Sequence, residues 1–270
     1  MRYQAALRPD IRYSNRMSAP ISALTWLEPG DFFPPVDTAW GQDSEAPGLL
    51  AAGGDLSPHS LRGAYSHGVF PWFSEGQPIL WWSTDPRMVL QVTHLKLHRS
   101  LRKTLQRFIK TPGCEVRFDT AFAQVIDACA HTSRRGQPGT WIVPDMVAAY
   151  TTMHAQGLAH SVETWIDGEL VGGLYCVALG QMVFGESMFA RQPDASKIAL
   201  TALVAFCRAN ALPIIDCQQN TAHLASLGAA EMPRANFVAQ VKDLVALPMP
   251  EWHFEPLYWK HLLSTQGTVT

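Results

Sequence analysis

The chain has 270 residues, of which 47% are apolar and 16% are charged, and its formal net charge is −2. This composition is typical of a folded globular protein with one large or two unequal domains, and any contact with nucleic acid must depend on a local basic patch. No apolar run is long enough to span a bilayer, the N-terminus lacks the features of a signal peptide, and the 5 cysteines lack C-x-x-C spacing, so we expect a cytoplasmic protein without a disulfide framework or a zinc site.

The N-terminal part is expected to be an extension followed by a small domain. Residues 1–25 show no clear periodicity and are interpreted as the extension, which leaves 26–86 for the small N-terminal domain. Ser57 is a good N-cap with Pro58 at the first helical position, and Gly68 fits a left-handed stop. These residues predict a short helix between them.

Aromatic residues crowd the stretch after this helix. Residues 79–82 are predicted to form a short strand, and for Trp81 and Trp82 a place in the core is weighed against an exposed stacking role. Trp72 follows a proline in a turn, where a ring is expected to be partly exposed and able to stack on a nucleic-acid base. Trp141, which leads into a predicted helix, is a second candidate for stacking.

A basic amphipathic helix is predicted over residues 97–110. Apolar residues recur along it at spacings of four, four and three, and they are Leu97, Leu101, Leu105 and Phe108. The basic residues of this helix are Arg99, Arg102, Lys103, Arg107 and Lys110. Such a face is either solvated or binds phosphate groups, and the absence of acids between the basic residues favours phosphate binding.

From residue 160 onward the pattern changes to the period of two that is typical of strands. Strands are expected at 161–166, 170–179, 182–189 and 212–218, with Asp167 and Gly168 as a two-residue hairpin turn between the first two. Helices are expected after the third and the fourth of these strands. This order, an antiparallel meander followed by helix, strand and helix, resembles the acyl-CoA N-acyltransferase (GNAT) superfamily. We therefore expect a mixed α+β protein in which residues 87–270 form a GNAT-like catalytic domain with a mainly antiparallel sheet.

Two of these strands carry polar side chains among apolar residues. Asp216 and Gln218 are two positions apart on a strand, so they are expected to point to one face while Cys217 points to the other. The pair either forms a buried hydrogen-bonded unit or positions and deprotonates an attacking amine. Glu186 poses the same choice between a buried, satisfied carboxylate and a partner for a cationic substrate group.

The sequence also indicates which cofactors to expect. A coenzyme A enzyme of this fold needs a glycine-rich turn whose amides bind the diphosphate, but the corresponding stretch, 190–197, contains no glycine. We therefore expect an acyl donor other than a coenzyme A thioester. His154 and His160 lie at opposite ends of a helix and turn and do not form a metal pair, and no P-loop or dinucleotide fingerprint is found.

Several sequence blocks, in one order, resemble a known family. They lie between Pro47 and Phe237 and read GLLAAGGDLSP, GVFPWFSEGQPILWWSTDPR, GTWI, AHSVETW, ELVGGLY, FGESMF, ASKIAL and IIDCQ. These blocks are similar to those of the leucyl/phenylalanyl-tRNA–protein transferases. The resemblance implies an enzyme that moves Leu or Phe, and Met less well, from aminoacyl-tRNA to the N-terminal Arg or Lys of a protein, which marks that protein for the bacterial N-degron pathway.

The resemblance also implies roles for individual residues. Asp216 and Gln218 match the pair assigned to amine activation, and Glu186 matches an acid that helps to hold the reacting groups. Trp72 and Trp141 match rings that contact the terminal adenosine of the tRNA. The pocket for the aminoacyl side chain falls on Leu174, Val183, Leu200, Leu203 and Ile215.

These roles lead to a mechanism without ATP, metal or cofactor, because an aminoacyl ester is already activated. Asp216 is expected to orient and polarise Gln218, whose carbonyl oxygen receives the proton of the amine, and either Asp216 or a ribose hydroxyl is the final acceptor. Glu186 is expected to pair with the Arg or Lys side chain of the protein acceptor, and the basic helix with phosphates of the acceptor stem. Two alternatives stay open, an acyl-CoA-dependent N-acetyltransferase and a non-catalytic adaptor that binds basic N-termini.

Overall fold

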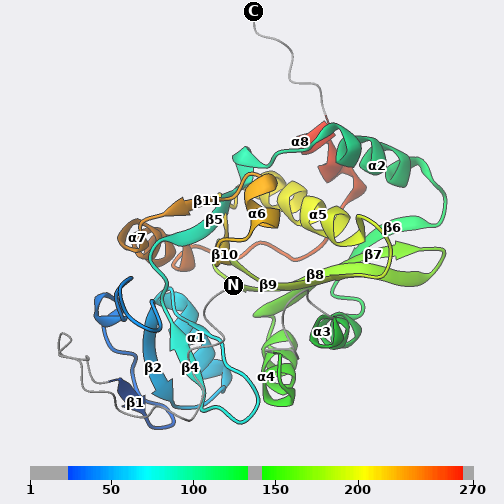
Figure 1. The fold of residues 1–270 in the computed structure, drawn as a ribbon. Coiled ribbons are helices and arrows are strands. Elements are labelled where there is room, and N and C mark those ends of the chain that lie inside the picture. The colour runs from blue at the N-terminus through cyan, green and yellow to red at the C-terminus, as the bar shows by residue number, and fades with distance from the viewer. Residues whose placement is uncertain (1–23, 133–141, 264–270) are drawn as a thin grey trace, which may run out of the picture.

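The computed structural model describes residues 24–132 and 142–263, so residues 1–23 of the predicted extension and Trp141 lie outside the described residues. Two sheets lie side by side (Figure 1), one with four strands in the order β1-β2-β4-β3 and one with seven in the order β11-β5-β10-β9-β8-β7-β6. The predicted α+β class with a mainly antiparallel sheet is therefore confirmed. None of the helices in the described ranges has the length and apolar character that crossing a bilayer requires.

The small sheet is built from the first part of the chain. Its elements are β1 (Thr25–Leu27), β2 (Leu49–Gly53), helix α1 (Pro58–Ser66), β3 (Phe70–Pro71) and β4 (Leu80–Trp82). Helix α1 begins and ends as predicted, because Ser57 Oγ accepts a hydrogen bond from the amide of Ser60 and Gly68 has a φ of 73°. Strand β2 is apolar throughout and was not predicted.

The seven-stranded sheet carries the rest of the chain. Its strands are β5 (Arg87–Gln91), β6 (Cys114–Phe118), β7 (Ala159–Ile166), β8 (Glu169–Leu179), β9 (Met182–Ala190), β10 (Ile214–Gln218) and β11 (Ala230–Met232). The central strands β7, β8 and β9 form the predicted antiparallel meander. Asp167 and Gly168 have φ values of 51° and 80°, which confirms the two-residue hairpin between β7 and β8. Strands β5 and β11 were missed, because neither alternates clearly in the sequence.

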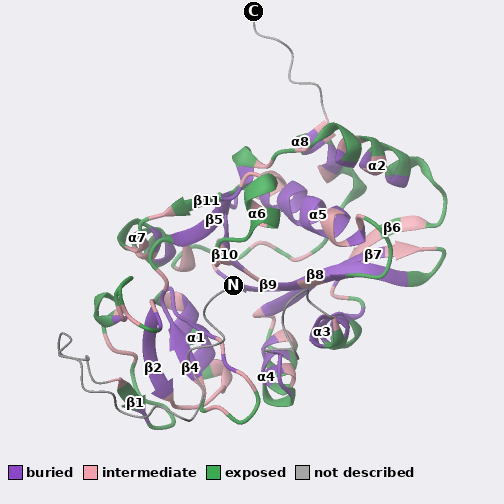
Figure 2. Cartoon of the chain, in the orientation of Figure 1, coloured by how far each residue is buried: buried purple, intermediate pink, exposed green. Residues whose placement is uncertain are grey.

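Helices cover both faces of this sheet (Figure 1). The helices are α2 (Arg99–Lys110), α3 (Phe122–His131), α4 (Pro144–Ala155), α5 (Ala195–Ala209), α6 (Ala222–Ser226), α7 (Arg234–Val245) and α8 (Lys260–Leu263), with short 3-10 turns at Val36–Thr38, Val92–His94 and Pro256–Trp259. Helices α3 and α4 lie on one face, and α5 lies on the other together with α2 and α8. Figure 2 shows that α5 and the central strands are largely buried, whereas α2 exposes one side.

The hydrophobic core is divided by the large sheet. One cluster joins the small sheet, α3 and α4 to one face of the large sheet, and it contains Trp81 and Trp82 at 0% and 4% exposure. Of the two alternatives for these rings, a place in the core is thus correct and an exposed stacking role is not. The second cluster lies between the other face and α5 and α2. Because α1 contributes Leu61, Ala64 and Tyr65 to the first cluster, the small sheet is packed onto the large sheet through apolar contact.

The feature that shapes the molecule for function is the divergence of β9 and β10. These strands pair in parallel only at Ile215 with Val183 and at Asp216 with Phe184. The register of β10 against β5 shifts between Asp216 and Gln218, and Gln218 has a φ of 59°. Beyond this bulge, β9 and β10 no longer share backbone hydrogen bonds, which leaves room between them for side chains and for a ligand.

One close approach fixes α5 against the sheet and provides a test of the packing. A methyl group added at Gly172 on β8 would lie 2.5 Å from Cβ of Ala195, the first residue of α5. We expect Gly172→Ala to lower the free energy of unfolding by about 1–3 kcal/mol, because backbone and helix must shift. Gly63 on α1 is a matched control, since the nearest atom to an added methyl is 4.0 Å away.

Gly63→Ala should instead stabilise the protein by about 0.5–1 kcal/mol, because alanine is the better helix former. Urea denaturation followed by circular dichroism measures both changes. Equal effects of the two substitutions would contradict the close contact between β8 and α5.

Candidate active site

A cavity of about 540 Å³ lies where β9 and β10 diverge. Its walls come from the β3–β4 segment, β8, β9, α5, β10 and α6. The lining residues are Phe70, Pro71, Trp72, Leu174, Tyr175, Gly185, Glu186, Ser187, Met188, Leu200, Leu203, Ile215, Asp216, Cys217, Gln218, Gln219, Thr221, His223 and Leu224. The cavity thus contains all three predicted catalytic residues and most of the predicted apolar pocket, drawn from both sheets.

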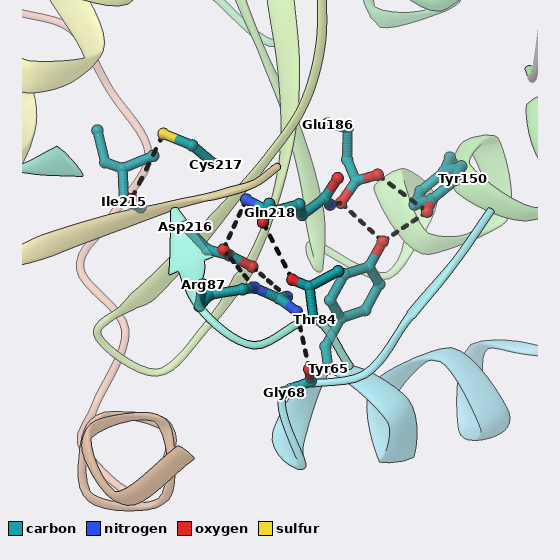
Figure 3. A network of polar contacts seen from close by, with 10 residues as sticks. All are labelled: Tyr65, Gly68, Thr84, Arg87, Tyr150, Glu186, Ile215, Asp216, Cys217 and Gln218. Atoms are coloured by element: carbon teal, nitrogen blue, oxygen red, sulfur yellow. Dashed lines mark hydrogen bonds and ion pairs between the residues drawn. The ribbon is translucent and has the colours of Figure 1, made fainter. Parts of the chain in front are cut away.

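Asp216 is held by a cation that the sequence did not predict. Nε and Nη2 of Arg87 donate to the two carboxylate oxygens of Asp216 at 2.8 Å and 2.6 Å, and both side chains have 0% exposure (Figure 3). Nη1 of Arg87 donates to the carbonyl of Gly68 just after α1. The guanidinium also lies 4.6 Å from the ring centres of both Phe70 and Phe237. A buried charge of this kind needs such a complete set of partners.

The bulge at the end of β10 decides where Gln218 points. The amide of Gln218 donates to Oδ1 of Asp216 at 2.9 Å, and its side-chain Nε2 donates to Oε1 of Glu186 at 3.1 Å (Figure 3). Asp216 thus contacts the backbone amide of Gln218, whereas the side chain of Gln218 contacts Glu186. The left-handed conformation of Gln218 turns its backbone towards Asp216 and sends its side chain to β9. Cys217 packs with the cluster on the α5 side, away from Asp216, as predicted.

Glu186 lies on β9 in a ring of polar groups from three elements. Oε1 of Glu186 accepts from Tyr65 Oη at 2.7 Å, and Oε2 accepts from Tyr150 Oη at 3.2 Å (Figure 3). The two phenol oxygens are themselves 2.5 Å apart. Burial raises the pKa of Glu186 to about 7, against the lowering effect of the two phenols. This carboxyl group therefore changes its charge near neutral pH.

The aminoacyl pocket predicted from the resemblance is largely assembled. Leu174, Leu200, Leu203 and Ile215 line the cavity, and Met188 and Leu224 extend the apolar wall. Val183 does not line it, although it was predicted to. It pairs with Ile215 at the first of the two positions where β9 and β10 are joined, and it is fully buried in the core.

Of the two candidate stacking rings, the structure describes one. Trp72 is half-buried, lines the cavity and contacts the ring of Trp82 at 5.5 Å between centres. Its carbonyl accepts a hydrogen bond from Nε1 of Trp82 at 2.7 Å, which fixes the turn. The predicted partial exposure of Trp72 is thus observed, with the ring at the cavity, whereas Trp141 lies outside the described residues.

The basic helix is observed close to its predicted bounds but away from the cavity. Leu101, Leu105 and Phe108 are buried, while Leu97 precedes the helix and is only half-buried. The basic residues are exposed or half-buried, and they are Arg99, Arg102, Lys103, Arg107 and Lys110. Within the described ranges none of the five forms an ion pair. Helix α2 packs on β6, at the opposite end of the sheet from β5 and β11, so it does not join the cavity residues.

His154 and His160 converge on an acid, which the sequence did not predict. Nδ1 of His160 lies 2.7 Å from Oδ2 of Asp119, and Nδ1 of His154 lies 3.8 Å from Oδ1 of the same residue. Their rings stack on Phe122 and Trp252, respectively, with centres 4.2 Å and 4.0 Å apart. No group of three or more metal-ligating side chains is formed in the part of the chain that the structure describes.

The turn between β9 and α5 is closed by its own hydrogen bonds. The amides of Arg191 and Gln192 donate to the carbonyl of Val171 at 2.7 Å and 3.3 Å. Asp194, at the helix start, has a φ of 64° and its carboxylate pairs with Lys197 at 2.7 Å. The turn is thus tied to β8, and it has no glycine before the first turn of α5.

Sequence reasoning missed three residues of this site, namely Tyr65, Arg87 and Tyr150. A signal existed for Arg87, which begins an otherwise apolar strand directly after a proline, where a charge needs a buried partner. The two tyrosines lie on the apolar sides of their helices and gave no sign of a polar partner.

The buried ion pair leads to a prediction on stability. We expect Arg87→Met to lower the free energy of unfolding by about 3–5 kcal/mol, because Asp216 would be left buried and unpaired. Arg62→Met is the matched control on exposed α1 surface, and it should change stability by less than about 0.5 kcal/mol. Urea denaturation of the variants measures both effects.

A double variant separates the loss of an ion pair from the loss of packing. Asp216→Leu combined with Arg87→Met should recover part of the stability that Arg87→Met loses, because no uncompensated charge remains. If Arg87→Met alone costs no more than Arg62→Met, the two charges are not buried together in solution.

Family models match two stretches of the chain. The model described as leucyl/phenylalanyl-tRNA protein transferase matches residues 89–242, and the model of the N-terminal domain of that family matches residues 54–85. Together they include every residue that lines the cavity, whereas Arg87 lies between the two matched ranges. The first match alone covers more than half of the chain.

Known proteins with this sequence pattern carry the same description. A leucyl/phenylalanyl-tRNA–protein transferase from a Polaromonas species is 63% identical over 90% of this chain and 95% of its own length. The enzyme of that name from Albidiferax ferrireducens is 58% identical over 94% of this chain and all of its own length. Among solved structures, a GCN5-related N-acetyltransferase from Kribbella flavida has a TM-score of 0.31 and 12% identity over 65% of this chain and 61% of its own.

Proposed function

The chain belongs to the leucyl/phenylalanyl-tRNA–protein transferase family, and on this premise we propose that it transfers Leu or Phe, and Met less well, from aminoacyl-tRNA to the N-terminal Arg or Lys of a protein. The product is a protein marked for the N-degron pathway. The observation that carries the proposal is one cavity in which an apolar wall meets a carboxylate and an amide, the groups that a hydrophobic aminoacyl ester and an amine require.

The donor would occupy the apolar part of the cavity. Leu200 and Leu203 of α5 and Ile215 of β10 form a wall that matches an aliphatic or aromatic side chain, and Trp72 offers its ring to the terminal adenosine. A coenzyme A donor is disfavoured, because the stretch 190–197 that leads into α5 contains no glycine. The aminoacyl ester brings its own activation, so the reaction needs neither ATP nor a metal ion.

The acceptor would enter at the polar end of the cavity. Among the described lining residues Glu186 and Asp216 are the acids, and none is Lys or Arg. Asp216 is neutralised by Arg87, which leaves Glu186 as the available negative group. An N-terminus with two positive charges, one on the α-amine and one on the side chain, is complementary to such a site.

The catalytic groups would place and activate the amine. Gln218 and Glu186 face the cavity and are within hydrogen-bond reach of each other, and Asp216 supports Gln218 through its backbone amide. In the reaction the amine nitrogen attacks the ester carbon, the C–N bond forms and the C–O bond to the ribose breaks. Holding the amine and the ester in one cavity provides much of the rate gain.

The tRNA body would contact a separate surface. Helix α2 presents basic residues without ion pairs in the described chain, and the net charge of −2 offers no general attraction to RNA. We assign the acceptor-stem phosphates to this helix, which lies on the same face of the large sheet as α5 (Figure 1). We further propose that a domain boundary falls between β4 and β5, near residue 86, and that the protein is cytoplasmic, where charged tRNA is found.

A transfer assay with defined partners tests the function. Labelled Leu and Phe on their tRNAs should pass to peptides that begin with Arg or Lys, and not to the same peptides with an acetylated N-terminus or with Glu first. Mass spectrometry of the products identifies the new peptide bond. Transfer of an acetyl group from acetyl coenzyme A would support the N-acetyltransferase alternative, and peptide binding without any transfer would support the adaptor.

The assignment of α2 predicts a change in salt dependence. Replacing Arg102 and Lys103 by Gln should reduce the slope of log affinity against log salt by up to about 2, since each phosphate contact in a duplex contributes about 0.9. Titration of aminoacyl-tRNA between low and moderate salt measures the slope. Lys242→Gln on exposed α7 is the control, and an unchanged slope in the α2 variant would exclude this face from the tRNA contact.

A further inference from the structure

Two carboxylates meet at the cavity, and only one of them is placed to receive a proton. We propose that Glu186 takes the proton of the attacking amine, and that Tyr65 and Tyr150 hold this proton in a closed ring of hydrogen bonds until it passes to the leaving ribose oxygen. The inference rests on the proposed function for the identity of the amine. It names Glu186 as the catalytic base and Tyr65 and Tyr150 as its positioning residues.

Asp216 is excluded from this role by its surroundings. Each of its oxygens accepts a hydrogen bond from Arg87, and Oδ1 also accepts from the amide of Gln218. The side chain has no exposure, so an amine in the cavity cannot approach it directly. Asp216 therefore fixes the end of β10 and is out of reach of the amine.

The ring around Glu186 has room for one proton more than its phenols supply. It consists of three oxygen–oxygen contacts: Tyr65 with Tyr150 at 2.5 Å, Tyr65 with Oε1 at 2.7 Å and Tyr150 with Oε2 at 3.2 Å. Each contact needs one proton to be a hydrogen bond, and the two phenols provide two. The third proton can only be one carried by the carboxyl group. The ring is thus complete when Glu186 is protonated.

A protonated Glu186 gives a consistent circuit. Its Oε2–H donates to Tyr150, the Tyr150 hydroxyl donates to Tyr65, and the Tyr65 hydroxyl donates back to Oε1 (Figure 3). Hydrogen bonds in such a chain polarise and strengthen one another. When Glu186 is ionised, both phenols donate to the carboxylate and the 2.5 Å contact between them has no proton; protonation of Oε2 lets Tyr150 turn its hydroxyl towards Tyr65.

Charged and titratable groups surround Glu186 on five elements. Tyr65 lies on α1, Tyr150 on α4, Asp216 on β10, Arg87 on β5, and Tyr175 and Cys176 on β8. The ion pair of Arg87 with Asp216 is neutral as a unit. Burial raises the pKa of Glu186 to about 7, which suits a group that accepts and returns a proton at neutral pH. Two carboxylates with opposite environments are the usual sign of divided roles in an active site.

Every proton and electron pair of the transfer reaction is accounted for. The α-amine enters as the free base, attacks the ester carbon and forms a tetrahedral intermediate with a positively charged nitrogen. This nitrogen gives one proton to Glu186. The C–O bond then breaks, the electron pair stays on the ribose oxygen, and Glu186 returns the proton to that oxygen. The products are an amide and a ribose hydroxyl, and the carboxylate is regenerated.

Titration of the enzyme without substrate tests the ring directly. In protein labelled with ¹³C at the glutamate carboxyl, the resonance that is absent from Glu186→Gln should titrate near the pKa of about 7. Tyr65→Phe and Tyr150→Phe should each move this titration to lower pH, because each opens the ring that stabilises the protonated carboxyl group. A shift to higher pH would show that the phenols act only as donors to the carboxylate, and would overturn the proposal. Tyr258→Phe, far from the cavity, is the control. A Glu186 resonance that titrates with the exposed glutamates, or that ignores both tyrosine variants, would overturn the proposal.

The pH dependence of single-turnover transfer then tests the chemistry. Glu186→Gln should lower kcat by about 100-fold or more. It should also remove the change of rate with pH near neutrality, which we call the neutral limb of the pH–rate profile. Tyr65→Phe and Tyr150→Phe should shift the limb by the amount seen in the titration, with KM for the peptide changed less than about twofold. The peptide amine titrates in the same way with every variant. Differences between the pH–rate profiles of the variants therefore arise from groups of the enzyme.

Three outcomes distinguish a failure of the role proposed for Glu186 from a failure of the proposed function. Loss of the limb in Asp216→Asn, with the limb retained in Glu186→Gln, would reassign the base to Asp216. Lower activity of the tyrosine variants with an unmoved limb would reduce the ring to a packing role. If the wild-type enzyme transfers nothing from any charged tRNA, the proposed function fails, while the substrate-free titration still decides whether the ring holds a proton.

Discussion

The ion pair of Arg87 with Asp216 is the interaction on which the rest of the structure depends. Removing two charges from water costs several kcal/mol for each ion, so such a pair persists only when every donor and oxygen is used. Here the guanidinium contacts β10, the end of α1 and two aromatic rings at once. The pair thereby joins the small sheet, the catalytic strand and α7 at one point.

The cavity follows from this fixed point. With Asp216 held, the amide of Gln218 is captured by the same carboxylate and the strand must bulge, which gives Gln218 its left-handed conformation. The bulge ends the pairing of β9 with β10, and the side chains beyond it face an open volume. A charged pair that contributes little to net stability thus determines the geometry of the site.

Local features of the sequence were sufficient for most of the fold. Helix α1 was predicted from Ser57, Pro58 and Gly68, and the β7–β8 hairpin from Asp167 and Gly168, because caps and turns depend on a few neighbouring residues. Apolar periodicity was enough for α2 and for the meander. Such signals act over a few residues, and they do not depend on what the rest of the chain does.

The network of the site could not be predicted in the same way. Arg87 is 129 residues from Asp216, and Tyr65 is 121 residues from Glu186, so no spacing pattern connects them. The bulge at Gln218 could not be predicted, because the residue with positive φ there is not a glycine. Of the residues that the resemblance gave for the apolar pocket, Leu174, Leu200, Leu203 and Ile215 line the cavity and Val183 is buried in the core. The roles of these residues, and of Trp72 and Trp141, stay predictions.

The hydroxyl contacts of Glu186 have a consequence for the relation between folding and activity. Tyr65 belongs to the part of the chain that builds the small sheet, whereas Glu186 and Tyr150 belong to the large one. A separation of the two parts by an ångström or two would break the ring while every strand of the large sheet stayed paired. Mild denaturant, heat or a substitution at the contact between the sheets should therefore silence the enzyme before spectroscopic signs of unfolding appear.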